Sequence, residues 1–226
     1  MQKTAEKTGL NERINDFVQK NRTPIFVSLG LIVLVIAGFI ISISIIDAVR
    51  KNAISAVEEL SERYDTLRPF VAEDPVNADL ETLVNDLETF AKKTNGYSGG
   101  RAWAIIAAIH SERKEWGEAE TAWAAAAQTA KKTYLEPLAW FNAGASAEEQ
   151  SKNDEALEYY TNSLAANTVF PAAAQAQFSI GRLKESGGDK DGALEAYRTL
   201  ISDRSYDTIW VNFAHSRIIA LEAQAE

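Results

Sequence analysis

Few residues of this chain have the types and spacings that catalysis or metal binding requires. The two histidines, His110 and His215, are far apart, and each lies in a segment with helical periodicity, where a packing or half-exposed role is usual. The His-Glu-x-x-His spacing of metal sites does not occur. The chain has no cysteine, which excludes disulfides, thiolate metal sites and a catalytic thiol. The sequence therefore predicts no metal and no cofactor.

Paired carboxylates and paired glycines occur without the context that would give them a chemical role. Glu58-Glu59 and Glu148-Glu149 are neighbours on expected helices, where adjacent side chains point about 100° apart and usually form a solvated face. Gly99-Gly100 and Gly187-Gly188 lack the strand and the Gly-Lys-Ser/Thr of a phosphate-binding loop, so we interpret both pairs as turns. We expect that the protein is not an enzyme.

An uncharged segment, residues 23–46, is long enough to cross a bilayer as a helix. At 1.5 Å per residue it exceeds the roughly 30 Å of a hydrocarbon core. A cleaved signal peptide is the alternative, but its apolar region would be about 7–15 residues long and would follow a shorter start than residues 1–22. We predict a tail at 1–22 and a single transmembrane helix at 23–46.

Charges around this segment predict its orientation and the surroundings of the C-terminal part. Basic residues before the span (Lys7, Arg13, Lys20, Arg22) outnumber those after it (Arg50, Lys51, Arg63), which favours a cytoplasmic tail and a domain across the membrane, in a bacterial periplasm. Residues 47–226 carry 18 basic and 29 acidic residues, a net charge of −11, which argues against nucleic acid as a partner. On the span, Gly38 and Ser42 form a small-xxx-small pair that would let a second membrane helix approach.

Residues 47–97 are expected to form a stalk helix and a leading helix. Apolar residues recur every three or four positions up to Leu67, which fits a short coiled coil or packing on the next helix, and we favour packing. Proline, glycine and capping residues predict the boundaries of these helices. Breaks are expected at Pro69 and Pro75, a cap at Asn77 or Asp79, and a loop at Asn95-Gly96 and Gly99-Gly100.

An internal repeat with a period of 37 residues occupies 98–207. Three copies align without a gap, each with a small residue followed four positions later by an aromatic residue. The aligned pairs are Ala119 and Trp123, Ala156 and Tyr160, and Ala193 and Tyr197. A small residue lets two helices cross closely, and the aromatic ring fills the adjoining space. This spacing is that of the tetratricopeptide repeat, whose consensus the stretches 140–144 and 154–160 resemble.

The sequence thus predicts an all-α chain in which a transmembrane helix precedes a tetratricopeptide-type solenoid. We expect three repeats at 98–207 and a capping helix at 208–226. Within the second repeat, Asn153 or Asp154 is expected to cap the second helix.

The layout of tail, single span, stalk and repeats resembles the YfgM-like ancillary subunits of the bacterial SecYEG translocon. The segment FAKKTNGYSGGRAWAIIAAIHSERKEWGEAETAW is similar to the junction that leads into the repeats of that family. The resemblance implies an inner-membrane protein whose periplasmic domain associates with the translocon or with periplasmic chaperones. We expect an adaptor for protein–protein interactions, with a structural subunit of an envelope complex as the alternative.

The known architecture of this repeat class places its first helices along a concave groove. On this register the residues expected to bind a partner are Ile105, Leu138, Phe141, Asn142, Phe178 and Arg182. The set is mostly apolar, so we expect a hydrophobic segment or an amphipathic helix as ligand, anchored by Phe141 and Phe178. The alternative is that both rings pack beneath the C-terminal helix or the stalk and leave no open groove.

Overall fold

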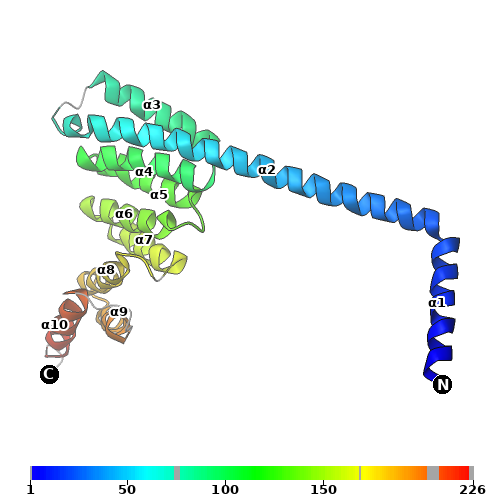
Figure 1. The fold of residues 1–226 in the computed structure, drawn as a ribbon. Helices are drawn as coiled ribbons and strands as arrows, with labels where there is room; N and C mark the ends of the chain where they lie inside the picture. Colours follow the sequence, from blue (N-terminus) through cyan, green and yellow to red (C-terminus); the bar gives the residue numbers. More distant parts are fainter. Residues whose placement is uncertain (1, 74–76, 168, 203–208, 224–226) are drawn as a thin grey trace. The chain divides into compact units, whose positions relative to one another are not determined.

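The computed structural model describes residues 2–73, 77–167, 169–202 and 209–223 and divides into two compact units, Met1–Asn52 and Ala53–Glu226. Over these ranges every regular element is a helix, which confirms the predicted all-α fold (Figure 1). The predicted break at Pro75 and the predicted start of the last helix at Thr208 lie outside the described residues.

The first unit contains α1 (Gln2–Lys20) and the beginning of α2 (Arg22–Leu67). Pro24 explains why the two helices are separate, since it has no N–H to donate to the carbonyl oxygen of Lys20. Asn21 occupies the break, and its backbone N and side-chain Nδ2 both donate to the Phe17 carbonyl oxygen, at 3.0 and 2.9 Å. The segment predicted only as a charged tail is therefore helical.

The apolar part of α2 fits the predicted single membrane helix. Its most apolar 18-residue window has a mean hydropathy of 3.0, and none of that window is buried by the rest of the chain. Leu34, for example, is 71% exposed.

In the second unit the end of α2 packs on the helices that follow it. Val57 and Tyr64 are buried in one apolar cluster with residues of α3 (Ala78–Lys93) and α4 (Gly96–Glu112). The Tyr64 hydroxyl donates to Glu112 Oε1 of α4 at 3.0 Å. This packing confirms that the periodicity of the stalk serves the chain's own next helices. A short 3-10 turn, Arg68–Phe70, follows α2 and contains the predicted breaker Pro69.

The predicted cap of α3 is confirmed, and so is a break before α4 at Asn95, but the loop predicted at Gly99-Gly100 is wrong. Asn77 Oδ1 accepts hydrogen bonds from the backbone N of Asp79 (3.0 Å) and Leu80 (3.2 Å). Gly99 and Gly100, in contrast, lie inside α4. A Cβ at Gly99 would lie 1.9 Å from the Thr94 carbonyl oxygen, and one at Gly100 would lie 2.4 Å from Ala130 Cβ. These glycines permit close backbone packing rather than a turn.

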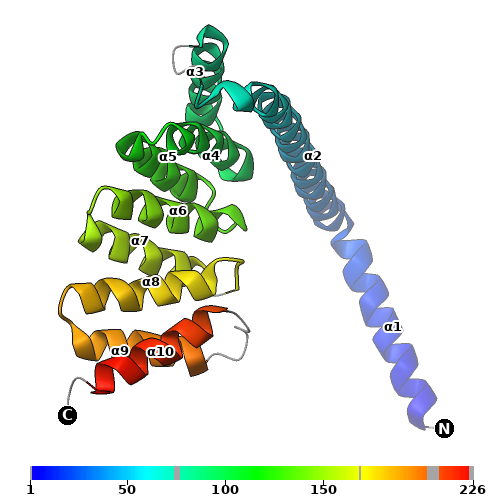
Figure 2. The same ribbon diagram turned by 90° about the vertical axis from the view of Figure 1, so that its left-hand side faces the viewer.

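Three helix pairs and a final helix follow one another along the chain and stack in that order (Figure 2). The pairs are α4 with α5 (Trp116–Thr129), α6 (Leu135–Glu149) with α7 (Asn153–Ala166), and α8 (Ala173–Ser186) with α9 (Lys190–Ser202). The final helix α10 is Ile209–Ala223. This is the predicted solenoid of paired helices.

Small and aromatic residues meet within the second and third pairs as the register predicted. Ala156 has no exposed surface, and Tyr160 is 2% exposed. A Cβ at Gly144 would lie 2.8 Å from the Tyr160 ring, and one at Gly181 would lie 2.4 Å from the Tyr197 ring. The rings therefore occupy the space that the glycines leave free.

The turn between the two helices of each pair also recurs every 37 residues. Lys114, Ser151 and Gly188 all have positive φ, of 60°, 61° and 83°. In each turn the next backbone N donates to a carbonyl oxygen five residues back, at 2.9–3.0 Å, as in a Schellman motif. Lys152 consequently takes the N-cap position of α7. The prediction that Asn153 or Asp154 caps this helix is therefore wrong.

Candidate protein-binding groove

Two neighbouring hollows lie along the first helices of the repeats. One, of about 510 Å³, is lined by α6, α7, α8 and α10, with contributions from Glu148, Phe178, Arg182 and Trp210. The other, of about 340 Å³, is lined by α4, α5 and α6, with contributions from Ser111, Glu112, Trp116, Trp123 and Asn142. Ala145 and Glu149 line both hollows. We name the two hollows together the repeat groove.

The predicted binding residues are only partly brought together there. Asn142, Phe178 and Arg182 line the repeat groove. Ile105 is only 2% exposed and belongs to the apolar cluster that contains Val57 of α2. The expectation that Ile105 faces a partner is corrected, because the end of α2 and its neighbours cover it.

Phe141 differs from its expected role as an anchor, whereas Leu138 stays a predicted groove residue. Phe141 is 9% exposed, and its ring lies 5.4 Å from the Tyr160 ring and 6.4 Å from the Phe170 ring, between centroids. Burial between α7 and the segment before α8 takes Phe141 out of the accessible surface, so it is a core residue rather than an anchor. Leu138 is partly exposed on α6.

Phe178 has both of the predicted roles, since it lines the repeat groove and packs beneath the final helix. Its ring centroid lies 5.5 Å from that of Tyr197, 5.4 Å from that of Trp210 and 6.0 Å from that of Phe213. The helix α10 thus covers one edge of Phe178, while the ring still borders the larger hollow.

Two of the groove's three carboxylates are engaged within the chain. Glu148 accepts a hydrogen bond from the Tyr160 hydroxyl at 2.6 Å and pairs with Arg182. Glu112 accepts from the Tyr64 hydroxyl and from Arg68 Nε at 2.8 Å. Burial, followed by the hydrogen bond to Glu112, raises the pKa of Tyr64 to about 12, so this hydroxyl remains a donor at neutral pH.

Glu149 differs from these two carboxylates. Its side chain is exposed, and no hydrogen bond or ion pair joins it to another described residue. It lies where the two hollows meet. The groove therefore offers one uncompensated negative charge beside partly exposed aromatic rings.

A hydrogen bond between the two helices of the pair recurs in every repeat. Trp123 Nε1 donates to Ser111 Oγ at 3.2 Å, the Tyr160 hydroxyl to Glu148, and the Tyr197 hydroxyl to Glu185 Oε2 at 3.0 Å. The three acceptors are spaced 37 residues apart, as are the three donors. Arginines then join each carboxylate to the next helix pair or the final helix, Arg182 to Glu148 and Arg217 to Glu185.

Sequence reasoning missed these partners, although the repeat alignment contains the signal. Positions 148 and 185 are both glutamate and each faces an aromatic donor of the same unit. The arginines could not be found in this way, because the positions 182 and 217 are not related by the 37-residue period.

The two histidines and the buried Glu120 are not among the residues that line the repeat groove. His110 Nδ1 lies 2.6 Å from Glu115 Oε2 at the turn after α4, and His215 is exposed on α10. The 8% exposed Glu120 accepts from Gln150 Nε2, Lys152 Nζ and the Tyr159 hydroxyl, at 2.8, 2.8 and 3.2 Å. These bonds join α5 to the second repeat.

Comparisons with known proteins agree with the repeat geometry. Residues 141–208 match the tetratricopeptide repeat family. A TPR repeat-containing protein of Treponema pallidum (strain Nichols) is 27% identical, over 92% of this chain and 93% of its own.

Solved structures show the same fold at low sequence identity. A kinesin light chain protein from Podosopora anserina with nearly identical TPR-like repeats is 14% identical, with a TM-score of 0.52 over 74% of this chain and 89% of that one. BtubC (BKLC) from P. vanneervenii is 12% identical, with a TM-score of 0.51 over 76% of this chain and 84% of that one. The resemblance to ancillary translocon subunits stays a prediction. The repeat geometry and the match over residues 141–208 together support tetratricopeptide repeats in this chain.

Proposed function

We propose that this protein is a membrane-anchored adaptor whose repeat groove binds a segment of another protein. The observation that carries the proposal is the pair of hollows along α4, α6 and α8, which join at Ala145 and Glu149. Tetratricopeptide repeats stack into extended concave surfaces of this kind, and such surfaces bind proteins.

The chemistry of the groove indicates the kind of ligand. The rings of Trp116, Trp123, Phe178 and Trp210 are partly exposed and offer apolar contact area. Aromatic side chains in such positions often contribute most of the binding energy of an interface. The exposed carboxylate of Glu149 favours a Lys or Arg on the ligand. The ligand proposed is therefore an amphipathic helical segment with an apolar face and a basic residue beside it.

The apolar surface of α2 supports the membrane anchor. A helix with this hydropathy whose most apolar window is not buried by its own chain needs an apolar surrounding, and a bilayer supplies one. The basic excess before the span favours a cytoplasmic α1 and periplasmic repeats at a bacterial inner membrane. Together with the resemblance to the ancillary translocon subunits, this supports our proposal that the partners belong to the translocon or are periplasmic chaperones.

A structural subunit of an envelope complex is the second candidate, favoured by one feature of α2. Apart from its chain neighbours and the backbone of its own helix, no atom lies within 4 Å of a Cβ built on Gly38, and Ser42 Oγ donates to the Gly38 carbonyl oxygen at 2.8 Å. This face is open to a second membrane helix. A complex that survives detergent extraction and is lost when Gly38 and Ser42 become Leu would support this candidate over the adaptor.

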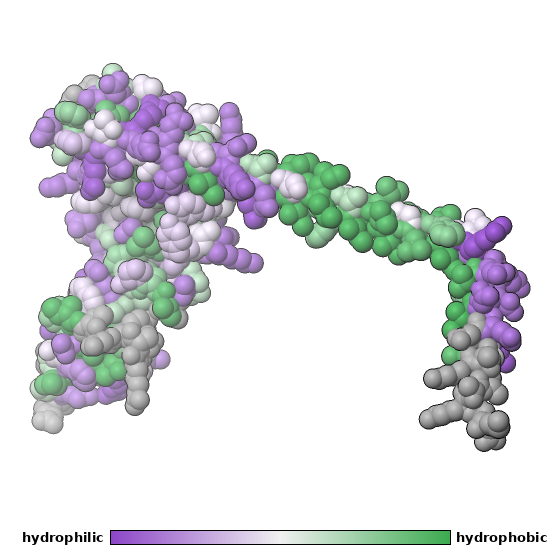
Figure 3. Space-filling model, in the orientation of Figure 1, coloured by the Kyte–Doolittle hydropathy of each residue, from purple (hydrophilic) through white to green (hydrophobic). Residues whose placement is uncertain are grey.

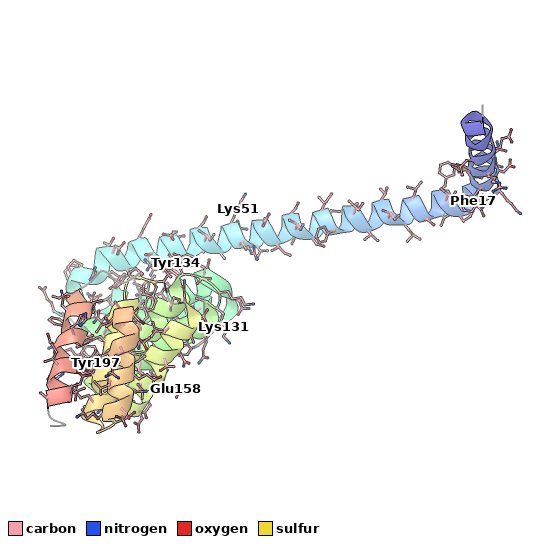
Figure 4. The ribbon with its side chains drawn as sticks, turned by 90° about the horizontal axis from the view of Figure 1, so that it is seen from below. Phe17, Lys51, Lys131, Tyr134, Glu158 and Tyr197 are labelled. Carbon is pink, nitrogen blue, oxygen red and sulfur yellow. The ribbon has the colours of Figure 1, made fainter. Side chains whose placement is uncertain are left out.

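A charge-reversal pair tests the adaptor. Glu149→Lys alters the groove, whereas Glu158→Lys makes the same change at an exposed residue of α7 outside the groove lining (Figure 4). A photo-crosslinking amino acid at Asn142 of the full chain reports partner contact in intact cells. We expect protein adducts that Glu149→Lys removes and Glu158→Lys leaves. Equal adduct yields in both variants, or equal adducts from a crosslinker at Glu158, would contradict groove binding.

Protease accessibility tests the orientation separately. Protease added to intact spheroplasts should digest the repeats, because the basic excess before the span favours their location outside the inner membrane. Protection of the repeats until the membrane is lysed would show the opposite orientation and would leave the groove result unaffected.

A further inference from the structure

The helix α1 carries an exposed apolar stripe along one side. Leu10, Ile14, Phe17 and Val18 are 60%, 53%, 65% and 46% exposed, although each is a large hydrophobic residue. Their spacing of four, three and one places them within an arc of about 100° on a helix with 3.6 residues per turn. Figure 3 shows this stripe as an apolar flank of α1 opposite a polar flank.

Over residues 10–20 the charged residues of α1 are arranged around that stripe. At about 100° per residue, Glu12 and Asp16 project on the side of the helix opposite the stripe. Arg13 and Lys20 lie about 90° to the side of it. An interfacial helix has this distribution, with apolar side chains below, basic side chains at the level of the phosphates, and acidic side chains facing water.

The position of α1 in the chain indicates what covers the stripe. One residue, Asn21, separates α1 from α2, and the apolar surface of α2 begins directly after Pro24. The chain bends at this break (Figure 1), which frees α1 from continuing along the axis of α2. A helix tethered at the end of a membrane span stays at the lipid surface, so its apolar flank meets lipid at high local concentration.

We infer that α1 lies in the membrane interface, with Leu10, Ile14, Phe17 and Val18 inserted at the boundary between headgroups and acyl chains. Arg13 and Lys20 then contact anionic headgroups. The inference rests on the proposed membrane anchor. It adds a second lipid-binding element, and it commits to lipid rather than a second copy of the chain as the occupant of the stripe.

The absence of cysteine allows a site-by-site test in the full chain. Single cysteines replace Ile14 or Phe17 on the stripe, and Glu12 or Asp16 on the opposite side of the same helix (Figure 4 labels Phe17). Each is labelled with a polarity-sensitive fluorophore and reconstituted into vesicles of phosphatidylcholine with a minor share of phosphatidylglycerol. Quencher-bearing lipids, modified near the headgroup or near the chain end, then report depth. Leu34→Cys serves as the control for the span.

The inference predicts blue-shifted emission at Ile14→Cys and Phe17→Cys. Shallow lipid quenchers should act on these two variants at least about twofold more strongly than on Glu12→Cys and Asp16→Cys. Equal, weak quenching at all four sites, with Leu34→Cys quenched by deep lipid, would overturn the inference and leave the anchor in place. Blue-shifted but unquenched stripe labels that self-quench at higher protein density would overturn it in favour of a second copy. Absence of quenching at Leu34→Cys would overturn the anchor and the inference together.

Discussion

Replacement of Gly181 by alanine tests whether the Tyr197 ring fills the space left by the glycine. A Cβ at Gly181 would lie 2.4 Å from Tyr197 Cε1 and 2.6 Å from Cδ1, well inside van der Waals contact. Tyr197 has no exposed surface, and its hydroxyl donates to Glu185 at 3.0 Å. The ring therefore cannot move without disturbing its neighbours or that hydrogen bond.

One stabilising and two destabilising terms set the expected change in the free energy of unfolding. Alanine in place of glycine inside a helix stabilises by about 1 kcal/mol. Overpacking of a filled core costs about 1–3 kcal/mol, and weakening a hydrogen bond to a carboxylate adds about 1.5–3 kcal/mol. We expect Gly181→Ala to lower the free energy of unfolding by about 1.5–5 kcal/mol.

Two other glycines provide a graded comparison. At Gly144 the same Cβ would lie 2.8–3.1 Å from the Tyr160 ring, so the loss should be smaller than at Gly181. At Gly117 the nearest atom, Gln150 Oε1, is 3.5 Å away, an ordinary contact. Gly117→Ala should therefore stabilise by about 0.5–1 kcal/mol.

Tryptophan fluorescence during urea unfolding measures all three variants in the full chain in detergent. The five tryptophans all lie between residues 103 and 210, so the signal reports the repeats and not the membrane helix. From most to least stable, the expected order is Gly117→Ala, wild type, Gly144→Ala and Gly181→Ala. A Gly181→Ala chain at least as stable as wild type would refute the assignment of Tyr197 to that space.

Four further variants follow from the same structure. Ala156→Leu should lower the free energy of unfolding by about 1–3 kcal/mol in the same urea titration, because Ala156 has no exposed surface and a larger side chain would overpack the core. An unchanged midpoint would refute the repeat register. Ser151→Gly should stabilise by about 1 kcal/mol, since Ser151 has a φ of 61°, and a loss of stability would contradict that turn conformation. Phe178→Ala should lower stability by about 3 kcal/mol through lost ring contacts, and normal melting with lost partner capture would instead assign Phe178 to binding alone. The hydrogen bond from Arg217 lowers the pKa of the Glu185 carboxyl in the folded state. The contribution of ionised Glu185 to the stability of the fold is therefore fully present above the unfolded-state pKa of about 4.3 and is lost as pH falls through the lower folded-state pKa. Glu185→Gln should therefore be less stable than wild type at neutral pH and comparable to it in acid, and a pH-independent difference would contradict this linkage.

The candidate groove was predictable in position but not in composition. The 37-residue period places Asn142, Phe178 and Arg182 on the first helices of their pairs, and all three line the hollows. The same reasoning selected Ile105 and Phe141, which are buried by the end of α2 and by Phe170. Helical periodicity gives the direction of a side chain but not the segment that covers it.

Patterns along the chain alone determined the class of this protein. Length and lack of charge at 23–46 predict a helix suited to a membrane, because a helix rises by a fixed amount per residue and no partner enters that argument. The 37-residue repeat predicts paired helices for a similar reason, since each unit contacts mainly its sequence neighbours. The tertiary structure decided which groups remain free. Glu148 and Glu149 are adjacent in the sequence, yet Arg182 of the next repeat neutralises one and leaves the other exposed, because side-chain charges interact across space and not along the chain.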